Sequence, residues 1–276
     1  MNSQSNPTPR RIVVTGSNKG LGYEIITKLL ASATPYEIIL TARNPALGEK
    51  ALETLRSNNP KSLSKVIYHQ LDVNDEKSIS EFLDWIKTIF GKIDVLVNNA
   101  AVAYTNPSDE EKKFTIQTNF FSVVNLSEKI LPLLSDDGKI LIMSSGLGEL
   151  DNQSEALRKA LEDPKLDRAG LLQVADNFLD LTKGFKSAFF TGEPSYPGSK
   201  ALVNAYVRYI LPNEVGANQQ VYAICPGWCK TDMGTDAAPL PAEAGADTPV
   251  YLIELPFKRD PEINGKFIHE RKVRGW

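Results

Sequence analysis

The sequence from residue 12 to residue 22 reads Ile12-Val13-Val14-Thr15-Gly16-Ser17-Asn18-Lys19-Gly20-Leu21-Gly22. A short apolar, β-branched run leads directly into a turn with three glycines and then into a segment with helical spacing. This order predicts a buried strand, a tight turn and the N-terminus of a helix. Glycines at such a junction let the backbone approach a pyrophosphate at the helix N-terminus. The spacing is weak evidence alone, but in this context it predicts a dinucleotide-binding βα unit.

Short apolar runs alternate with helical patterns along the rest of the chain. Strands that are apolar throughout and separated by helices indicate a parallel sheet covered on both faces, with ligands at the carboxyl ends of its strands. We therefore predict one α/β domain over residues 1–276, a Rossmann-type doubly wound parallel sheet of about seven strands. The expected strands are residues 12–15, 37–42, 65–70, 93–98, 138–144, 220–225 and 266–269.

Composition excludes several classes of function. The chain has 42% hydrophobic and 24% charged residues and a net charge of −3, which is ordinary for a globular protein. No block rich in lysine or arginine stands out, so nucleic acid and anionic membranes are not expected partners. No apolar run approaches membrane-spanning length. Residues 1–11 are polar and lack the apolar core of a signal peptide, so we expect a flexible tail there.

Cysteine usage points to a reducing compartment. Cys225 and Cys229 are the two cysteines of the chain. They give no disulfide framework and too few ligands for a zinc site, so no metal is expected. The cytoplasm is therefore the expected location.

The end of the second expected strand bears on the choice of nucleotide. An acidic residue there would bind the adenosine ribose hydroxyls and repel a 2′-phosphate, but the chain has Ala42 followed by Arg43. Arginine can bind a phosphate with two hydrogen bonds, and Lys19 adds a second positive charge. We therefore expect NADPH rather than NADH. The alternative is that Arg43 is a solvated loop residue.

Two further strand ends are expected to contact the adenosine half. Asp72-Val73 follows the third strand, where a carboxylate could accept the adenine amino group, although a turn or helix-cap role is equally compatible. Asn99 ends the fourth strand beside small residues, and its side chain could equally satisfy backbone groups. The expected cofactor-binding residues in the first half of the chain are Gly16, Asn18, Lys19, Gly20, Leu21, Gly22, Arg43, Asp72, Val73 and Asn99.

Tyr196 and Lys200 are the strongest candidates for chemistry. At a spacing of four residues the two side chains share one face of a helix. A lysine ammonium beside a phenol stabilises the phenolate and would lower the phenol pKa from about 10 toward neutrality. The pair then predicts a general acid that protonates an oxygen. The same spacing also fits an ordinary pair on a helix surface.

These motifs together resemble the short-chain dehydrogenase/reductases over essentially the whole chain, and more closely the monomeric, NADPH-dependent carbonyl reductases. The resemblance rests on motifs in the family's order. They are Thr15-Gly16 to Gly22, Leu40 to Arg43, Asn98-Asn99-Ala100, Thr118 to Phe121, Ser144-Ser145, Tyr196 to Lys200, Cys225 to Trp228, Thr231-Asp232-Met233 and the tail from Gly265 to Trp276.

The resemblance implies a catalytic tetrad of Asn119, Ser145, Tyr196 and Lys200. Tyr196 would donate the proton, and Lys200 would lower its pKa and bind the nicotinamide ribose. Ser145 would polarise the substrate carbonyl. Asn119 would hold a water linking Lys200 to solvent. Ser144 competes with Ser145, but the family's catalytic serine is the second of such a pair. The alternatives are an ordinary strand-end hydroxyl for Ser145 and a backbone-bonded amide for Asn119.

The loop after the sixth expected strand is also implicated by resemblance. Its backbone and Thr231 would meet the nicotinamide carboxamide, which adds Pro226, Gly227, Cys229 and Thr231 to the expected cofactor-binding residues. Trp228 would form a wall of the substrate pocket together with Ser145 and Tyr196, or would simply anchor its loop. We expect a substrate flap over about residues 234–256.

The spacing between Ser145 and Tyr196 differs from that of most of the family and favours the carbonyl reductases within it. Ser145 and Tyr196 are separated by 196 − 145 = 51 positions. The carbonyl reductases carry a helical insertion in this place, expected here over about residues 147–192. Apolar residues at helical spacing support it, with Pro164 between two helices. In the wider family the neighbouring helix surfaces pair subunits, and a packed insertion would cover them. The resemblance therefore implies a monomer.

The resulting expectation is reduction of a ketone, aldehyde or quinone carbonyl on a small molecule by NADPH, with proton donation from Tyr196. Two alternatives remain. The same residues would serve an alcohol dehydrogenase working oxidatively with NADP⁺. A catalytically silent dinucleotide sensor is also compatible with the fold, although such a protein would be expected to lose Tyr196 or Lys200.

Overall fold

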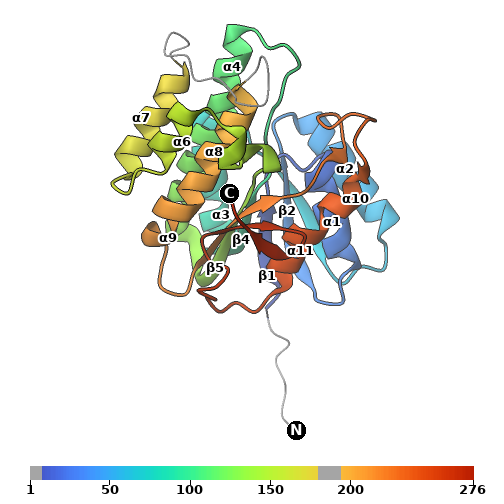
Figure 1. Cartoon of the computed structure of the whole chain (residues 1–276). Coiled ribbons are helices and arrows are strands. Elements are labelled where there is room, and N and C mark those ends of the chain that lie inside the picture. Colours follow the sequence, from blue (N-terminus) through green and yellow to red (C-terminus); the bar gives the residue numbers. More distant parts are fainter. Residues whose placement is uncertain (1–7, 180–193) are drawn as a thin grey trace.

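A computed structural model describes residues 8–179 and 194–276 (Figure 1). Within these residues the main sheet has eight strands in the order β10-β9-β6-β5-β4-β1-β2-β3. All neighbouring strands pair in parallel except β10, which runs antiparallel to β9 at one edge. The strands are β1 (Arg10–Val14), β2 (Tyr36–Ala42), β3 (Lys65–Gln70), β4 (Ile93–Asn98), β5 (Leu134–Met143), β6 (Gln220–Cys225), β9 (Lys266–His269) and β10 (Lys272–Arg274).

The predicted doubly wound sheet is confirmed, with one strand more than the seven expected. The additional strand, β10, returns after Glu270 and Arg271, which both have positive φ. Two-residue hairpin loops of this kind usually carry Asn-Gly or Asp-Gly. The strand itself is three exposed residues, so neither its turn nor its composition gave a signal. β7 (Cys229–Lys230) and β8 (Leu240–Pro241) form a separate parallel pair.

The first strand begins earlier than expected. Arg10 and Arg11 belong to β1 rather than to the flexible tail expected over residues 1–11. Arg10 forms ion pairs of 2.6 Å with Asp94 and 2.8 Å with Asp137, and Arg11 pairs with Glu37 at 3.0 Å. These partners lie on β4, β5 and β2. The ion pairs to residues distant in sequence therefore stabilise β1 at its polar first two residues. Residues 1–7 of the expected tail lie outside the described residues.

Helices cover both faces of the sheet (Figure 1). One face is packed by α1, α2 and α11, and the other by α3, α4, α5 and α8. The helices are α1 (Gly20–Ala31), α2 (Pro45–Asn58), α3 (Glu76–Ile89), α4 (Asp109–Ile116), α5 (Ser122–Ile130), α6 (Glu155–Leu161), α7 (Arg168–Leu179), α8 (Ser195–Ala205), α9 (Leu211–Glu214), α10 (Ala242–Gly245) and α11 (Asp247–Glu254). No helix within the described ranges is long and apolar enough to cross a membrane.

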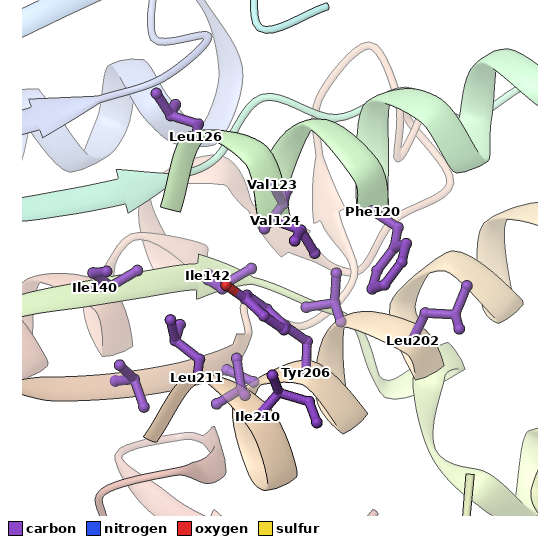
Figure 2. Packing of buried hydrophobic residues seen from close by; sticks show 14 of the residues in the cluster. Phe120, Val123, Val124, Leu126, Ile140, Ile142, Leu202, Tyr206, Ile210 and Leu211 are labelled. Carbon is purple, nitrogen blue, oxygen red and sulfur yellow. The ribbon is translucent and has the colours of Figure 1, made fainter. Parts of the chain in front are cut away.

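The helix that carries the Tyr196 motif is fixed by a continuous apolar core. Figure 2 shows Leu202 and Tyr206 packed with Phe120 and with Ile142 of β5. Tyr206 is 1% exposed and continues α8 through a π-helical turn, η6 (Tyr206–Ile210). Core side chains of this size bury enough apolar surface to stabilise the contact by about 1.5–3 kcal/mol each. This packing therefore fixes α8 against the sheet, near the carboxyl ends of its strands.

The described part of the expected insertion begins with two short 3₁₀ turns and continues with α6 and α7. Their apolar faces join the same core cluster as α5 and α8, through Leu157, Leu161, Leu171, Ala175 and Phe178. Arg168 at the start of α7 forms a bidentate ion pair with Glu128 of α5. Its Nε and Nη2 donate to the two carboxylate oxygens at 2.6 and 2.7 Å. The insertion is thus packed onto the domain as far as residue 179. Residues 180–193 of the expected range lie outside the described residues.

The expected flap region divides into two different parts. Residues 234–241 are mostly exposed, whereas α11 packs into the core against α1. Lys139 of β5 is 0% exposed, and its Nζ donates to the carbonyls of Leu252, Ile253 and Leu255 at 2.6–3.1 Å. A buried cation at these last carbonyls satisfies groups that a helix end leaves unpaired. Residues 247–254 are therefore fixed to the sheet, so this part of the expected flap is packed into the domain.

Candidate active site

A cavity of about 450 Å³ lies at the carboxyl ends of the parallel strands. It connects the glycine turn after β1 with the start of α8 and the loop after β6. Most of the expected cofactor-binding residues line it, as the topology of an open parallel sheet requires. They are Gly16, Asn18, Lys19, Gly20, Leu21, Arg43, Asp72, Val73, Asn99, Tyr196, Lys200, Pro226 and Thr231.

The glycine turn is built for a close approach. Gly16 and Gly20 have φ of +59° and +58°, which side chains with a Cβ rarely adopt. A Cβ on Gly22 would lie 2.6 Å from Asn99 Nδ2 and 2.8 Å from Ser17 Cα. Lys19 occupies the N-cap of α1 without a side-chain capping bond. The turn therefore leaves a narrow backbone cradle at a helix N-terminus, and it fits the pyrophosphate of a dinucleotide.

Asn99 holds this cradle in place. Its Nδ2 donates to the carbonyls of Thr15 at 2.8 Å and Gly16 at 3.1 Å. Thr15 Oγ1 in turn accepts from the backbone N–H groups of Asn99 and Ala100, each at 2.9 Å. The backbone-satisfying role considered for Asn99 is thus present. Asn99 therefore shapes the glycine turn.

Positive charge gathers at the rim of the cavity. Arg43 is exposed there, and Lys19 Nζ forms a 2.6 Å ion pair with Asp232, which lies across the cavity mouth. Both partners of that pair are more than half exposed, so the pair is weak and a phosphate can replace the carboxylate. Asp72 also lines the cavity, but its Oδ1 accepts from the Asn74 backbone at 3.0 Å. The expected turn role of Asp72 is therefore present.

Tyr196, Lys200 and Ser145 converge beside the cavity. Lys200 is 3% exposed, and its Nζ donates to the Met143 carbonyl at 2.8 Å and lies 5.6 Å from the Tyr196 ring centroid. Burial raises the pKa of Tyr196 to about 12, against a lowering contribution from its hydrogen bond with Ser145. Burial lowers the pKa of Lys200 to about 8. In the structure, the expected lowering of the Tyr196 pKa is therefore reversed, because desolvation outweighs the neighbouring groups.

The structure separates the roles of the two adjacent serines. Ser144 Oγ donates to Asn204 Oδ1 at 2.6 Å, and the residue is 3% exposed. Ser145 is half-buried and close enough to Tyr196 to lower the pKa of its phenol, and its Oγ accepts from the Leu147 N–H at 3.2 Å. Ser145 lies next to the phenol rather than on the cavity lining. The hydroxyl in contact with Tyr196 is that of Ser145, which is the serine preferred from sequence.

Asn119 lies in a π-helical turn, η1 (Gln117–Phe121), between α4 and α5. Its Oδ1 accepts from the Val102 N–H at 2.9 Å, and its Nδ2 donates to the Val102 carbonyl at 2.9 Å and to Ser199 Oγ at 3.1 Å. The backbone-bonded role considered for this amide is therefore realised. The side chain joins the loop after β4 to α8, and π-helical turns of this kind are frequent at functional sites.

The loop after β6 contributes less to the cavity than expected. Pro226 and Thr231 line it, whereas Gly227 and Cys229 do not, and Cys229 is buried with its thiol bonded to the Pro226 carbonyl at 3.3 Å. Trp228 is 56% exposed, and its Nε1 donates to the Gly234 carbonyl at 2.9 Å. It does not line the cavity. The structure thus favours its alternative role as an anchor of the loop.

Several lining residues were missed from sequence. The most prominent are Tyr104 and Phe114 on the segment after β4 and Met233 on the loop after β6. Tyr104 and Met233 are 37% and 42% exposed, so they form an apolar rim at the opening. Their position just beyond strand carboxyl ends was the available signal. They are candidates for contact with an apolar substrate.

Gly148 sets how closely the Ser145 turn approaches α8. A Cβ there would lie 2.6 Å from the Lys200 carbonyl carbon and 2.8 Å from its oxygen. Gly148→Ala is therefore expected to push the turn away from the helix, lower the free energy of unfolding by about 1–3 kcal/mol and reduce activity. Urea unfolding and NADPH consumption would measure this. Gly275→Ala controls for added backbone stiffness, because nothing lies within 4 Å of its Cβ position and its φ is not in the left-handed region. A Gly148→Ala variant as active as wild type would contradict the packing argument.

Comparison with known proteins identifies the family. Residues 10–157 match the family model described as short chain dehydrogenase. Carbonyl reductase (NADPH) 1 of Sus scrofa is 32% identical, covering 97% of this chain and 94% of that protein. Among solved structures, salutaridine reductase from Papaver somniferum superposes with a TM-score of 0.81 at 30% identity, covering 95% of this chain and 99% of that one.

Menthone neomenthol reductase from Mentha piperita is similar at 27% identity and a TM-score of 0.78, covering 95% of this chain and 99% of that one. The family match spans more than half of the chain and includes the glycine turn, Asn99 and Ser145. The similarity to the relatives extends over nearly the whole length and therefore includes Tyr196 and Lys200. This chain belongs to the short chain dehydrogenase family.

Proposed function

We propose that the protein reduces a carbonyl group on a small molecule with NADPH. The observation that carries this proposal is the convergence of the Tyr196 phenol, the Ser145 hydroxyl and the Lys200 ammonium beside a cavity that begins at a glycine turn. NADPH, when bound, supplies the hydride. The protein orients the reactants and provides the proton.

The roles of the three side chains follow from their positions. Tyr196 lines the cavity and donates its phenolic proton to the substrate oxygen. Ser145, whose hydroxyl lies beside that phenol, donates to the same oxygen and stabilises the charge that develops on it. Lys200 binds the nicotinamide ribose and supplies positive charge close to the phenol. Asn119 keeps α8 in register with the loop after β4 through Ser199.

The protonation state of the phenol suits the reductive direction. Burial raises the pKa of Tyr196 to about 12, so the phenol keeps its proton at neutral pH. A protonated phenol suits a donor in reduction, whereas oxidation of an alcohol requires the phenolate as a base. This favours carbonyl reduction over the oxidative alternative. Both directions should be measured with a carbonyl and its matching alcohol.

The test of function is a screen for NADPH consumption. The purified protein would be offered quinones, aromatic ketones, aldehydes and the ketones named for its structural relatives, salutaridine and menthone. Reduction of at least one class is expected. Tight NADPH binding without consumption across the whole panel would instead support the silent dinucleotide sensor.

Arg43 is proposed to select NADPH by binding its 2′-phosphate, with Lys19 as a second cation. A charge-assisted hydrogen bond contributes about 1.5–3 kcal/mol. Arg43→Asp is therefore expected to raise the dissociation constant for NADPH about 10- to 100-fold and to change that for NADH little. Fluorescence titration of both nucleotides would measure this. Arg208→Asp makes the same charge change at an exposed arginine outside the cavity, and equal losses for NADPH and NADH in Arg43→Asp would refute the selection.

The remaining proposals concern assembly and location. We propose a monomer, because α6 and α7 cover α8 and its neighbours, and Arg168 ties α7 to Glu128 of α5. A cytoplasmic location is proposed from the two free cysteines, which are buried. Residues 234–241 are proposed as a flap, since they lie beside Met233 on the cavity rim. Light scattering at several protein concentrations would test the monomer.

A further inference from the structure

Asn204 is a buried amide directly behind the catalytic residues. It is 1% exposed and lies on α8, one helical turn after Lys200 and two turns after Tyr196. Its Oδ1 accepts the Ser144 hydroxyl at 2.6 Å, and its Nδ2 donates to the Gly148 carbonyl at 3.2 Å. No role was assigned to this side chain from sequence. Its two partners are the residues that bracket the turn carrying Ser145.

The turn between these partners is also held from its own segment of the chain, where Asn152 Nδ2 donates to the Gly146 carbonyl at 2.8 Å and Gln153 Nε2 donates to the Leu147 carbonyl at 2.7 Å. These bonds shape the turn itself and do not connect it to α8. Ser145 Oγ accepts from the Leu147 N–H at 3.2 Å, which orients the hydroxyl within the turn. Gly146 N donates to Cys225 Sγ at 3.2 Å, a weak bond because sulfur is a poor acceptor. Gly148 lies against the backbone of Lys200, so the turn and α8 are in direct contact. Asn204 is the side chain of α8 that fixes both ends of the turn.

A buried amide in this position needs an explanation. Burying a polar side chain costs free energy unless its hydrogen bonds are made, and an apolar side chain would fill the same space without that cost. Here both ends of the amide are used, and both bonds connect the helix of the proton donor to the turn of the carbonyl-polarising serine. A displacement of α8 would therefore move the turn that carries Ser145, and the reverse, because the planar Asn204 amide is bonded to both.

We propose that Asn204 is a positioning residue that fixes Ser145 relative to Tyr196 for carbonyl reduction. The inference rests on the proposed function. Misplacement of a catalytic group by about 1 Å can reduce a rate about 10²-fold. Asn204→Ala is therefore expected to lower kcat about 10- to 100-fold and to leave the KM for NADPH nearly unchanged, because the turn does not form the nucleotide cradle.

Two readouts separate positioning from simple loss of stability. The first is the kcat of Asn204→Ala, Ser145→Ala and the double variant, where the double variant should be no slower than Ser145→Ala. The second needs no turnover: the protein is labelled with ¹³Cζ-tyrosine, and the Tyr196 signal is assigned by its loss in Tyr196→Phe. Because the Ser145 hydroxyl lies close enough to the phenol to influence its pKa, Asn204→Ala should move that signal in the same direction as Ser145→Ala does.

Gln219 provides the matched control. It is also a buried amide, 7% exposed, whose Oε1 accepts from the Gly216 N–H at 2.8 Å and whose Nε2 donates to the Ser135 carbonyl at 3.0 Å. These bonds lie at the opposite end of the sheet. Gln219→Ala should lower the melting temperature comparably and leave both kcat and the Tyr196 signal unchanged. If Asn204→Ala does not fold, Ser144→Ala removes the same 2.6 Å bond from the other side and should move the Tyr196 signal in the same direction.

The outcomes are distinct. A shifted Tyr196 signal that is non-additive with Ser145→Ala supports the positioning role, even if no carbonyl substrate is found and the proposed function fails. An unshifted Tyr196 signal in Asn204→Ala, together with a melting temperature lowered as in Gln219→Ala, overturns the inference. A double variant much slower than Ser145→Ala also overturns it, because Asn204 would then act independently of Ser145.

Discussion

Replacing Tyr196 with phenylalanine is expected to lower the rate of carbonyl reduction about 10²- to 10⁴-fold while NADPH still binds. The substitution removes the hydroxyl and keeps the ring. Tyr196 is half-buried in α8, with most of its neighbours on that helix fully buried, so the ring should stay in place. The lost group is the proposed proton donor, so the substrate oxygen would have no phenol beside it to protonate it. NADPH consumption gives the rate, and fluorescence titration gives the affinity.

Tyr104 is the control for this experiment. It is a second tyrosine on the cavity lining, 37% exposed, on the segment after β4. Tyr104→Phe removes a hydroxyl from the same cavity without touching Ser145 or Lys200, and it should keep most of the activity. A Tyr196→Phe variant with undiminished turnover would exclude the phenol as the donor. Equal losses in both variants would point to a general effect on the cavity.

The sheet and the nucleotide cradle were predictable because their signals are local. Each parallel strand of the main sheet is four to ten residues long and contains a short apolar run, and the glycine turn combines its residues within one short stretch. The topology of a doubly wound sheet then brings the strand ends together without further information. Asn99, Arg43 and Tyr196 were accordingly expected at one edge of the sheet, and the structure places all three on one cavity.

What sequence did not give depends on long-range contacts. Lys139 stands in an apolar strand pattern, and only the end of α11, more than a hundred residues later, explains its burial. In the sequence, Asn204 is an ordinary polar residue of a helix. Its role is visible only in the folded protein, where it is hydrogen-bonded to Ser144 and Gly148. The pKa of Tyr196 has the same origin, because desolvation by the folded surroundings raises it, while the spacing to Lys200 alone suggested the opposite.

The second large effect concerns Lys200. Replacing it with methionine should lower the rate of carbonyl reduction and raise the free energy of unfolding. Lys200 is 3% exposed, and within residues 8–179 and 194–276 its ammonium makes one hydrogen bond, to the Met143 carbonyl. Burial lowers its pKa from 10.5 to about 8. Between those values the unfolded chain binds a proton that the folded protein does not, so stability rises with pH across this window. Below it the folded protein carries the full cost of burying the charge, about 3 kcal/mol at neutral pH.

Methionine fits the same space without that cost. Lys200→Met loses one hydrogen bond, about 1 kcal/mol, and gains relief from the burial penalty, so at neutral pH it should be about 2 kcal/mol more stable than wild type. The difference should shrink as pH rises from 8 toward 10.5, because wild type then sheds the proton. Carbonyl reduction should fall at least about 10²-fold, since the charge beside Tyr196 is gone.

Urea unfolding without added NADPH, at neutral and at alkaline pH, measures the difference in the free energy of unfolding between Lys200→Met and wild type. Lys50→Met, at an exposed position of α2, should show neither effect. A variant less stable than wild type at neutral pH would show that Lys200 is retained for the fold, whereas the expected gain would show that this lysine is kept for chemistry at a cost to the fold.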